Sequence, residues 1–149
     1  CRSGHSTPIH VTLVPPFSSK KSTEEIRDII NGILPLLTPF VGKVDGYGSF
    51  GNRTIFLRVL PSEDWDNLSQ VLAKGLRAMG ESVKVDGKKL IPHFTVANRD
   101  IPPESFSFML DKLSSHGFSS NFTVDSVALF HREGRLWRLR EEDIIKIGM

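Results

Sequence analysis

Two copies of one tripeptide pattern bring together the residue types of acid–base chemistry. They are His10-Val11-Thr12 and His93-Phe94-Thr95. With five histidines and seven threonines in 149 residues, chance supplies about 0.2 tripeptides of this kind, and the chain has two. Two imidazoles can divide the work near neutral pH, because one can act unprotonated as a general base while the other acts protonated as a general acid.

Each copy lies in an apolar, β-branched run with a proline near one end. The runs cover residues 9–14 and 90–97, and both predict short, buried strands. Because side chains alternate along a strand, the histidine and threonine of each copy should project from one face, about 6.5 Å apart. Val11 and Phe94 should face the core. Two such strands lying side by side would place four polar side chains along one cleft.

This set of side chains is sufficient for phosphodiester chemistry without a metal. His10 and His93 would supply the acid and the base, although the sequence does not decide which is which. The hydroxyls of Thr12 and Thr95 could donate hydrogen bonds to the non-bridging oxygens of a phosphate.

Other sites fit the sequence less well. A zinc site needs three or four converging ligands, but the chain has no Cys-x-x-Cys, no His-x-x-x-His and no His-rich cluster. A serine triad lacks its nucleophile-elbow pattern, and Cys1 as an N-terminal nucleophile has no further supporting feature. Both histidines could instead be core residues satisfied by hydrogen bonds, but the repeated threonine partner argues against this.

Length and composition limit the class of protein. The chain has 149 residues, a formal net charge of +2, one cysteine and a pI near 8.8. This size suits one domain, and the weak basicity favours a small anionic substrate over an extended nucleic-acid-binding surface. One cysteine and the lack of an apolar run of about 20 residues predict a cytoplasmic protein without a membrane span. We expect a monomer.

Three helices are predicted from apolar stripes at helical spacing. Ser22 and Glu25 form a capping box that opens the first helix, and Pro35 or Pro39 ends it. Gly80 closes the second helix. The helices are expected from residue 23 to about 35, from 61 to 80 and from 102 to 117.

The remaining segments predict strands and turns. Strands are expected over 40–44 and 54–60, and a hairpin with arms 124–131 and 136–140 is expected to turn at Glu133-Gly134. The glycine-spaced segment 45–52 has neither the lysine of a P-loop nor the spacing of a dinucleotide fingerprint. It is therefore predicted to be a turn.

The order of the elements contains an internal repeat. Strand, helix, His-Thr strand and helix follow one another from Thr54, whereas the N-terminus begins directly with a His-Thr strand. His93 lies 39 positions after Thr54, but only nine residues precede His10. We therefore expect one domain of two lobes over residues 1–149, with about 30 residues of a first strand and helix lying upstream or shortened.

The residues around both motifs resemble those of the two-histidine phosphoesterases, which include 2'-5' RNA ligase-like proteins and cyclic nucleotide phosphodiesterases. The resemblance extends over nearly the whole chain, and its specific part is the paired motif. It runs through His10-Val-Thr-Leu-Val-Pro-Pro-Phe17, Pro92-His-Phe-Thr-Val96 and Val127-Ala-Leu-Phe-His-Arg132. It implies an α+β fold, bilobal and pseudo-twofold, with antiparallel sheets around a central cleft and helices outside.

The resemblance also implies an activity. This is the hydrolysis of 2',3'-cyclic phosphates, on RNA ends or on small cyclic nucleotides, or of 2'-5' phosphodiesters, without a metal or other cofactor. The catalytic roles then fall on His10, Thr12, His93 and Thr95. The alternative from another class is a nucleotide- or RNA-end-binding module that has the same cleft and negligible turnover.

Four further residues are candidates for substrate binding. The resemblance makes His131 or Arg132 a phosphate ligand, and alternation along a strand allows only one of these neighbours to face a cleft. Phe50 and Tyr47 could stack on a base.

Overall fold

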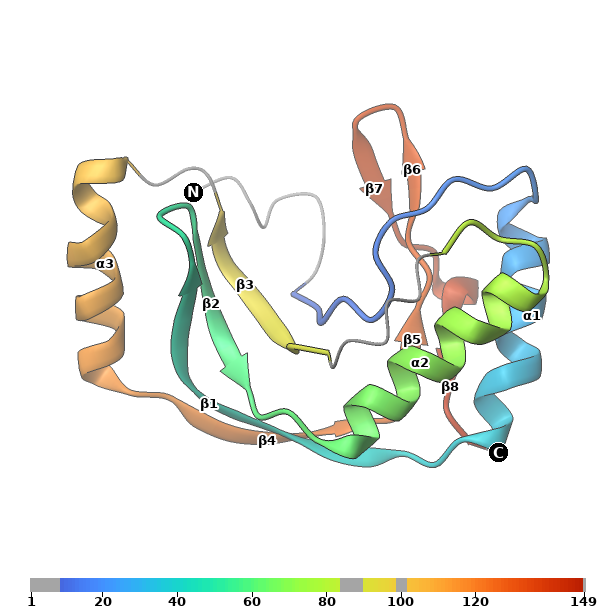
Figure 1. Cartoon of the computed structure of the whole chain (residues 1–149), viewed down its shortest axis with the longest axis horizontal. Helices are drawn as coiled ribbons and strands as arrows, with labels where there is room; N and C mark the ends of the chain where they lie inside the picture. Colours follow the sequence, from blue (N-terminus) through green and yellow to red (C-terminus); the bar gives the residue numbers. More distant parts are fainter. Residues whose placement is uncertain (1–8, 84–89, 99–101, 149) are drawn as a thin grey trace. The chain divides into compact units, whose positions relative to one another are not determined.

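A computed structural model describes residues 9–83, 90–98 and 102–148 (Figure 1). In this part of the chain the elements are, in order, α1 (Thr23–Ile33), the 3-10 helix η1 (Leu34–Leu36), β1 (Phe40–Phe50), β2 (Thr54–Val59), α2 (Glu63–Ala78), β3 (His93–Asn98), α3 (Pro103–His116), β4 (Ser119–Val124), β5 (Ser126–Ala128), β6 (His131–Glu133), β7 (Leu136–Arg138), the 3-10 helix η2 (Glu141–Asp143) and β8 (Ile144–Lys146). Helices combined with antiparallel strand pairs confirm the predicted α+β class.

The chain forms two compact units, each assembled from several segments. Unit 1 contains the described residues in 9–12, 42–60 and 91–122, and unit 2 contains those in 13–41, 61–90 and 123–148. Both His-Thr motifs belong to unit 1.

Unit 1 is built on a sheet with the strand order β3-β2-β1-β4, in which β2 pairs antiparallel with both β1 and β3. Phe56 lies opposite Gly48 on one side and Thr95 on the other, so these three residues share one face of the sheet. Ile55 lies on the other face because neighbouring residues of a strand alternate.

Helix α3 covers the Ile55 face of this sheet. Phe106 of α3 is buried against Ile55, and half-buried side chains pack around this pair, namely Tyr47, Met109, Leu110 and Leu113. The apolar stripe predicted for the third helix therefore lies on α3 and faces the sheet. As a result, the face that carries Phe56 and Thr95 is the one opposite α3.

Unit 2 contains α1 and α2, which pack on each other (Figure 1). Ser22 and Ser62 cap the two helices, because each hydroxyl accepts a hydrogen bond from the backbone N–H three residues later, at 3.2 and 3.5 Å. Gly80 follows α2 with a φ of 94°. These local signals lie in the sequence itself, and the first two predicted helices are confirmed. Their apolar faces form a core of Ile26, Ile30, Leu34, Trp65, Leu68, Leu72 and Leu76.

The glycine-spaced segment continues a strand, which corrects the prediction of a turn over 45–52. β1 extends to Phe50, with a bulge between Val44 and Tyr47 where Gly46 has a φ of 77°. Gly48 lies beneath the ring of Phe56, where an added Cβ would come within 2.7 Å of ring carbons. A bulge and a close ring contact both require glycine. In a sequence, such glycines look the same as the glycines of a turn.

The predicted late hairpin is only partly correct. β6 and β7 pair across Gly134 as expected, but the preceding arm is divided, because β5 pairs with β8 instead. The backbone N–H of Leu129 also donates to the carbonyl of Asp143 at 2.9 Å. β8 follows the segment 124–140, over which alternating polar and apolar residues predicted the hairpin. Its pairing with β5 therefore could not be read from that local pattern.

Membrane insertion through a helix finds no support in the structure. Among the described residues, every helix is too short or too polar to cross a bilayer.

Candidate functional site

The second motif lies on β3 as predicted. His93 is opposite Arg58 and Thr95 is opposite Phe56, so both side chains project from the face opposite α3. Phe94 lies opposite Leu57, on the α3 side, and its ring contacts that of Phe122 at 5.3 Å. The alternation that the sequence implied for this copy is confirmed.

The ring of His93 has a defined orientation. Its Nδ1 lies 2.8 Å from the carbonyl oxygen of Ile91, and because a carbonyl can only accept, Nδ1 is the donor. Phe50 and Phe56 flank the ring, with centroid distances of 4.9 and 5.2 Å. In the neutral ring this leaves Nε2 with the lone pair, and Nε2 makes no hydrogen bond to any described residue.

Thr95 is exposed on the same face as His93. Its hydroxyl makes no hydrogen bond within the described ranges. Thr12 is likewise exposed, and its hydroxyl has no partner in that part of the chain. Both hydroxyls can therefore donate to a ligand.

The first motif does not lie on a strand, which corrects the prediction for residues 9–14. His10, Val11 and Thr12 form an irregular segment, and the chain bends at Leu13. The Leu13 carbonyl accepts a hydrogen bond from the Ser69 hydroxyl at 2.8 Å in place of a ladder partner. β-branched composition favours a strand only where a ladder forms. Exposure still alternates, since His10 and Thr12 are exposed and Val11 is half-buried.

The two aromatic candidates have different surroundings. Phe50 is 42% exposed and lies on the His93 face, with its ring 4.4 Å from that of Phe56. Tyr47 packs into the Ile55–Phe106 cluster on the α3 face. The ring of Tyr47 is therefore packed on the α3 face, whereas Phe50 stays available beside His93.

A comparison with protein families gives a match over the part of the chain that contains both His-Thr motifs. A family model described as the 2'-5' RNA ligase superfamily matches residues 4–136. The chain belongs to this superfamily. It is the superfamily of the two-histidine phosphoesterases, so the recognition from the motif residues is confirmed. Membership supports a phosphoesterase or RNA ligase-like function. A comparison with curated proteins finds no match.

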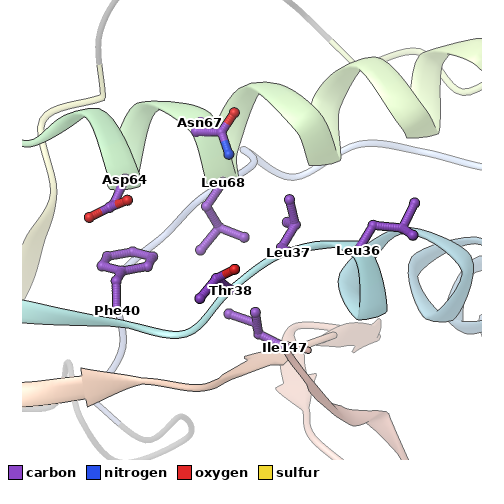
Figure 2. Close-up of a pocket in the computed structure, with 8 residues that line it drawn as sticks. All are labelled: Leu36, Leu37, Thr38, Phe40, Asp64, Asn67, Leu68 and Ile147. Atoms are coloured by element: carbon purple, nitrogen blue, oxygen red, sulfur yellow. The ribbon is translucent and has the colours of Figure 1, made fainter. Parts of the chain in front are cut away.

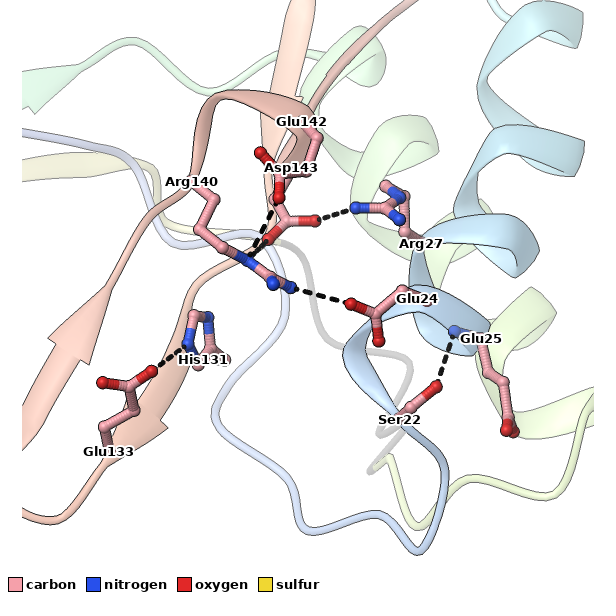
Figure 3. Close-up of polar contacts among 9 residues, drawn as sticks. All are labelled: Ser22, Glu24, Glu25, Arg27, His131, Glu133, Arg140, Glu142 and Asp143. Atoms are coloured by element: carbon pink, nitrogen blue, oxygen red, sulfur yellow. Dashed lines mark hydrogen bonds and ion pairs between the residues drawn. The ribbon is translucent and has the colours of Figure 1, made fainter.

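The superfamily match includes β6, where His131 and Arg132 lie on opposite faces of the hairpin in unit 2. The Nε2 of His131 donates to Glu133 at 2.9 Å (Figure 3), and its Nδ1 is buried without a partner among the described residues. This bond, with the Arg138 charge nearby, holds the pKa of the Glu133 carboxyl below its usual value. Arg132 is exposed, and only its Nε is engaged, by the Gly134 carbonyl at 2.8 Å. Arg132 therefore retains free N–H groups, whereas His131 does not.

A second polar cluster in unit 2 is structural. The Asp143 carboxylate is fully buried and accepts from Arg27 Nη1 at 2.9 Å and from Arg140 Nε at 3.0 Å (Figure 3). The hydrogen bond and charge of Asp143 raise the pKa of the Arg140 guanidinium, which therefore stays protonated. The two cations compensate the buried charge, and the cluster joins α1 to η2.

A pocket lies elsewhere in unit 2 (Figure 2). It has a volume of about 210 Å³ and is lined by Leu36, Leu37, Thr38, Phe40, Asp64, Asn67, Leu68 and Ile147. None of the residues predicted for the site lines it. In the described ranges, no group of three or more His, Cys, Asp or Glu residues is arranged to hold a metal.

Two contributors to the site were missed in the sequence. The Ile91 carbonyl fixes the His93 tautomer, and the Phe56 ring supports the imidazole. Phe56 lies in the strand predicted over 54–60, but its partner Gly48 lies in the segment predicted to be a turn, so their contact had no signal in the sequence. The carbonyl had none, since every residue has one.

Proposed function

We propose that this protein is a metal-independent phosphodiesterase that opens 2',3'-cyclic phosphates at RNA ends or on nucleotides, or cleaves 2'-5' phosphodiesters. His10 and His93 are the acid–base pair, and Thr12 and Thr95 donate to the phosphate. The orientation of His93 carries the proposal. One ring nitrogen is occupied by Ile91, and the other is free on the face that presents Thr95.

The reaction needs two proton transfers at phosphorus. One histidine accepts a proton from water as the water oxygen bonds to phosphorus, and the other histidine protonates the ribose oxygen as its bond to phosphorus breaks. The product is a 2'- or 3'-phosphate, depending on which ribose oxygen leaves. Hydrogen bonds from the threonines stabilise charge that develops on the non-bridging oxygens. Arg132, in unit 2, keeps free guanidinium N–H groups that can bind a phosphate of the substrate.

Hydrolysis of 2',3'-cyclic nucleotides in the presence of a chelator tests this proposal. His10→Ala and His93→Ala should each lower kcat by about 10²- to 10⁴-fold. His116→Ala is the matched control, because His116 is an exposed histidine at the end of α3 in the same unit and should leave kcat unchanged. Turnover that survives both site substitutions, or that requires a divalent metal, would contradict the mechanism.

The same assay separates the alternative of a binding module. In that case the wild-type protein would bind the cyclic nucleotide without hydrolysing it, and His93→Ala would weaken binding but change no rate.

A further inference from the structure

The positive charge of the chain is concentrated in one short segment. Residues 131–140 contain four arginines and one glutamate, a formal net charge of +3, whereas the whole chain carries +2. The remaining 139 residues therefore sum to −1. The segment contains the β6–β7 hairpin. The net charge of the whole chain is too low for an extended nucleic-acid-binding surface, but the positive charge of this segment is locally strong.

The two faces of the hairpin differ in how their cations are used. On one face Arg138 lies opposite His131 and is 3.6 Å from the Glu133 carboxylate, which also binds His131. Arg140, beyond the hairpin, is held by Asp143 and Glu24 (Figure 3). Carboxylates therefore neutralise much of the positive charge on this side.

The other face and the turn keep their charge. Arg132 lies opposite Trp137 and makes no ion pair with any described residue. Arg135, in the turn beside Gly134, is exposed and has neither a hydrogen bond nor an ion pair within the described ranges. Trp137 is half-buried and makes no ring contact there. Two uncompensated guanidinium groups thus lie on a hairpin with an indole.

We propose that Arg132 and Trp137 on this face of the hairpin, together with Arg135 in the turn, bind single-stranded RNA. The two arginines bind backbone phosphates and the indole stacks on a base. Cations that follow the backbone beside an aromatic ring are the recognition elements of single-strand binding, and an unpaired strand leaves its bases free to stack. The inference extends the proposed function, since it makes an oligonucleotide, rather than a free cyclic nucleotide, the preferred substrate.

Direct binding measures this surface without any need for turnover. Fluorescence anisotropy of a labelled oligouridylate of about ten nucleotides is recorded from about 50 to 200 mM salt. Each phosphate contact contributes about 0.7 to the slope of log K against log salt for a single strand. Arg135→Gln should lower the slope by about 0.7, and the double substitution Arg132→Gln/Arg135→Gln by about 1.4.

The indole is tested by substitutions that leave the charge unchanged. Trp137→Ala should weaken binding by about fivefold or more with the same salt slope, and Trp137→Phe should recover most of the affinity. Circular dichroism of each variant checks that it folds. Trp137→Phe and Arg135→Gln carry the test if Trp137→Ala does not fold.

A matched control and two opposing outcomes make the result decisive. Arg77→Gln removes the same charge from the last turn of α2 and should leave the salt slope unchanged. A slope reduced equally by Arg77→Gln would overturn the proposal in favour of non-specific attraction. Binding to phosphatidylserine vesicles that depends on the hairpin arginines, without RNA binding, would overturn it in favour of a membrane surface. If RNA binds as expected but cyclic nucleotides are not hydrolysed, the proposed function fails and the hairpin surface stands.

Discussion

The Nδ1 of His93 donates a hydrogen bond of 2.8 Å to the carbonyl oxygen of Ile91, two residues earlier in the chain. This hydrogen bond fixes the imidazole of His93, the first residue of β3, against the backbone of Ile91. Phe50 and Phe56 limit the rotation of the ring, so Nε2 is presented on the sheet face of Thr95. A catalytic imidazole with a fixed tautomer needs no reorientation before it transfers a proton.

The first prediction concerns that tautomer. Nitrogen-15 NMR of histidine-labelled protein, at a pH where the ring is neutral, should show Nδ1 of His93 protonated and Nε2 unprotonated, because the carbonyl of Ile91 requires a donor. His93→Gln identifies the signal by removing it. A predominantly Nε2-protonated ring would contradict the hydrogen bond.

The second prediction isolates the hydroxyl of Thr95. Thr95→Val keeps the shape of the side chain but removes the donor, and kcat on a cyclic phosphate should fall by about 10²- to 10³-fold. Thr95→Ser keeps the donor and should retain most of the activity. A loss in Thr95→Ser as large as the loss in Thr95→Val would contradict the role of the hydroxyl as donor, because the serine variant keeps the hydroxyl and lacks only the methyl group.

The third prediction concerns the glycine beneath Phe56. An alanine Cβ at position 48 would lie 2.7 Å from ring carbons of Phe56, so Gly48→Ala should lower the free energy of unfolding by about 1–3 kcal/mol, as measured by urea denaturation. It should also reduce kcat, because Phe56 supports His93. Gly32→Ala is the control. Gly32 lies on α1 with nothing within 4 Å of the added Cβ, and this change should stabilise by up to about 1 kcal/mol. Equal effects at the two sites would contradict the close contact.

The fourth prediction concerns the buried carboxylate of unit 2. Asp143→Asn should lower the free energy of unfolding by about 3 kcal/mol, because Arg27 and Arg140 lose their charge partner, although both reach solvent in part. Glu142→Gln is matched, since Glu142 lies 3.7 Å from the same Arg140 but is exposed, and its cost should stay below about 1 kcal/mol. Thermal or urea unfolding measures both. Similar costs would mean that burial of the Asp143 carboxylate does not matter.

The fifth prediction is a pH dependence from Glu81. Hydrogen bonds from Lys21, at 2.7 Å, and from Ser19 hold the pKa of the Glu81 carboxyl below its ordinary value of 4.5. The ionised form is therefore favoured by folding, and its stabilising contribution is complete above the unfolded pKa and lost as the pH falls through the lower folded value.

Glu81→Gln should therefore lower Tm near pH 7, and the difference from wild type should narrow as the pH falls below 4.5. Glu104→Gln, at an exposed position of α3, should change Tm little at either pH. A Tm difference for Glu81→Gln that stays constant from neutral to acid pH would contradict the role of the ion pair.

Local signals determined much of the architecture. Ser22 and Ser62 cap their helices through hydrogen bonds from the backbone N–H three residues later, and the apolar residues of each helix recur every three or four residues. Both the caps and the apolar stripes depend on near neighbours, so both can be recognised in the sequence. The paired His-x-Thr motif was sufficient to identify the superfamily. Along β3, strict alternation also determined that His93 and Thr95 share a face.

The tertiary structure decided whatever depended on partners distant in sequence. Ser69 binds the carbonyl of Leu13 where a strand was expected, and the ring of Phe56 explains a glycine that looked like part of a turn. The pairing of β5 with β8 divided a predicted hairpin. A hydroxyl, a glycine or a β-branched residue can each pair with several different partners, so the sequence alone does not identify the partner. The folded chain selects one partner, because buried polar groups need hydrogen bonds and buried rings need close packing.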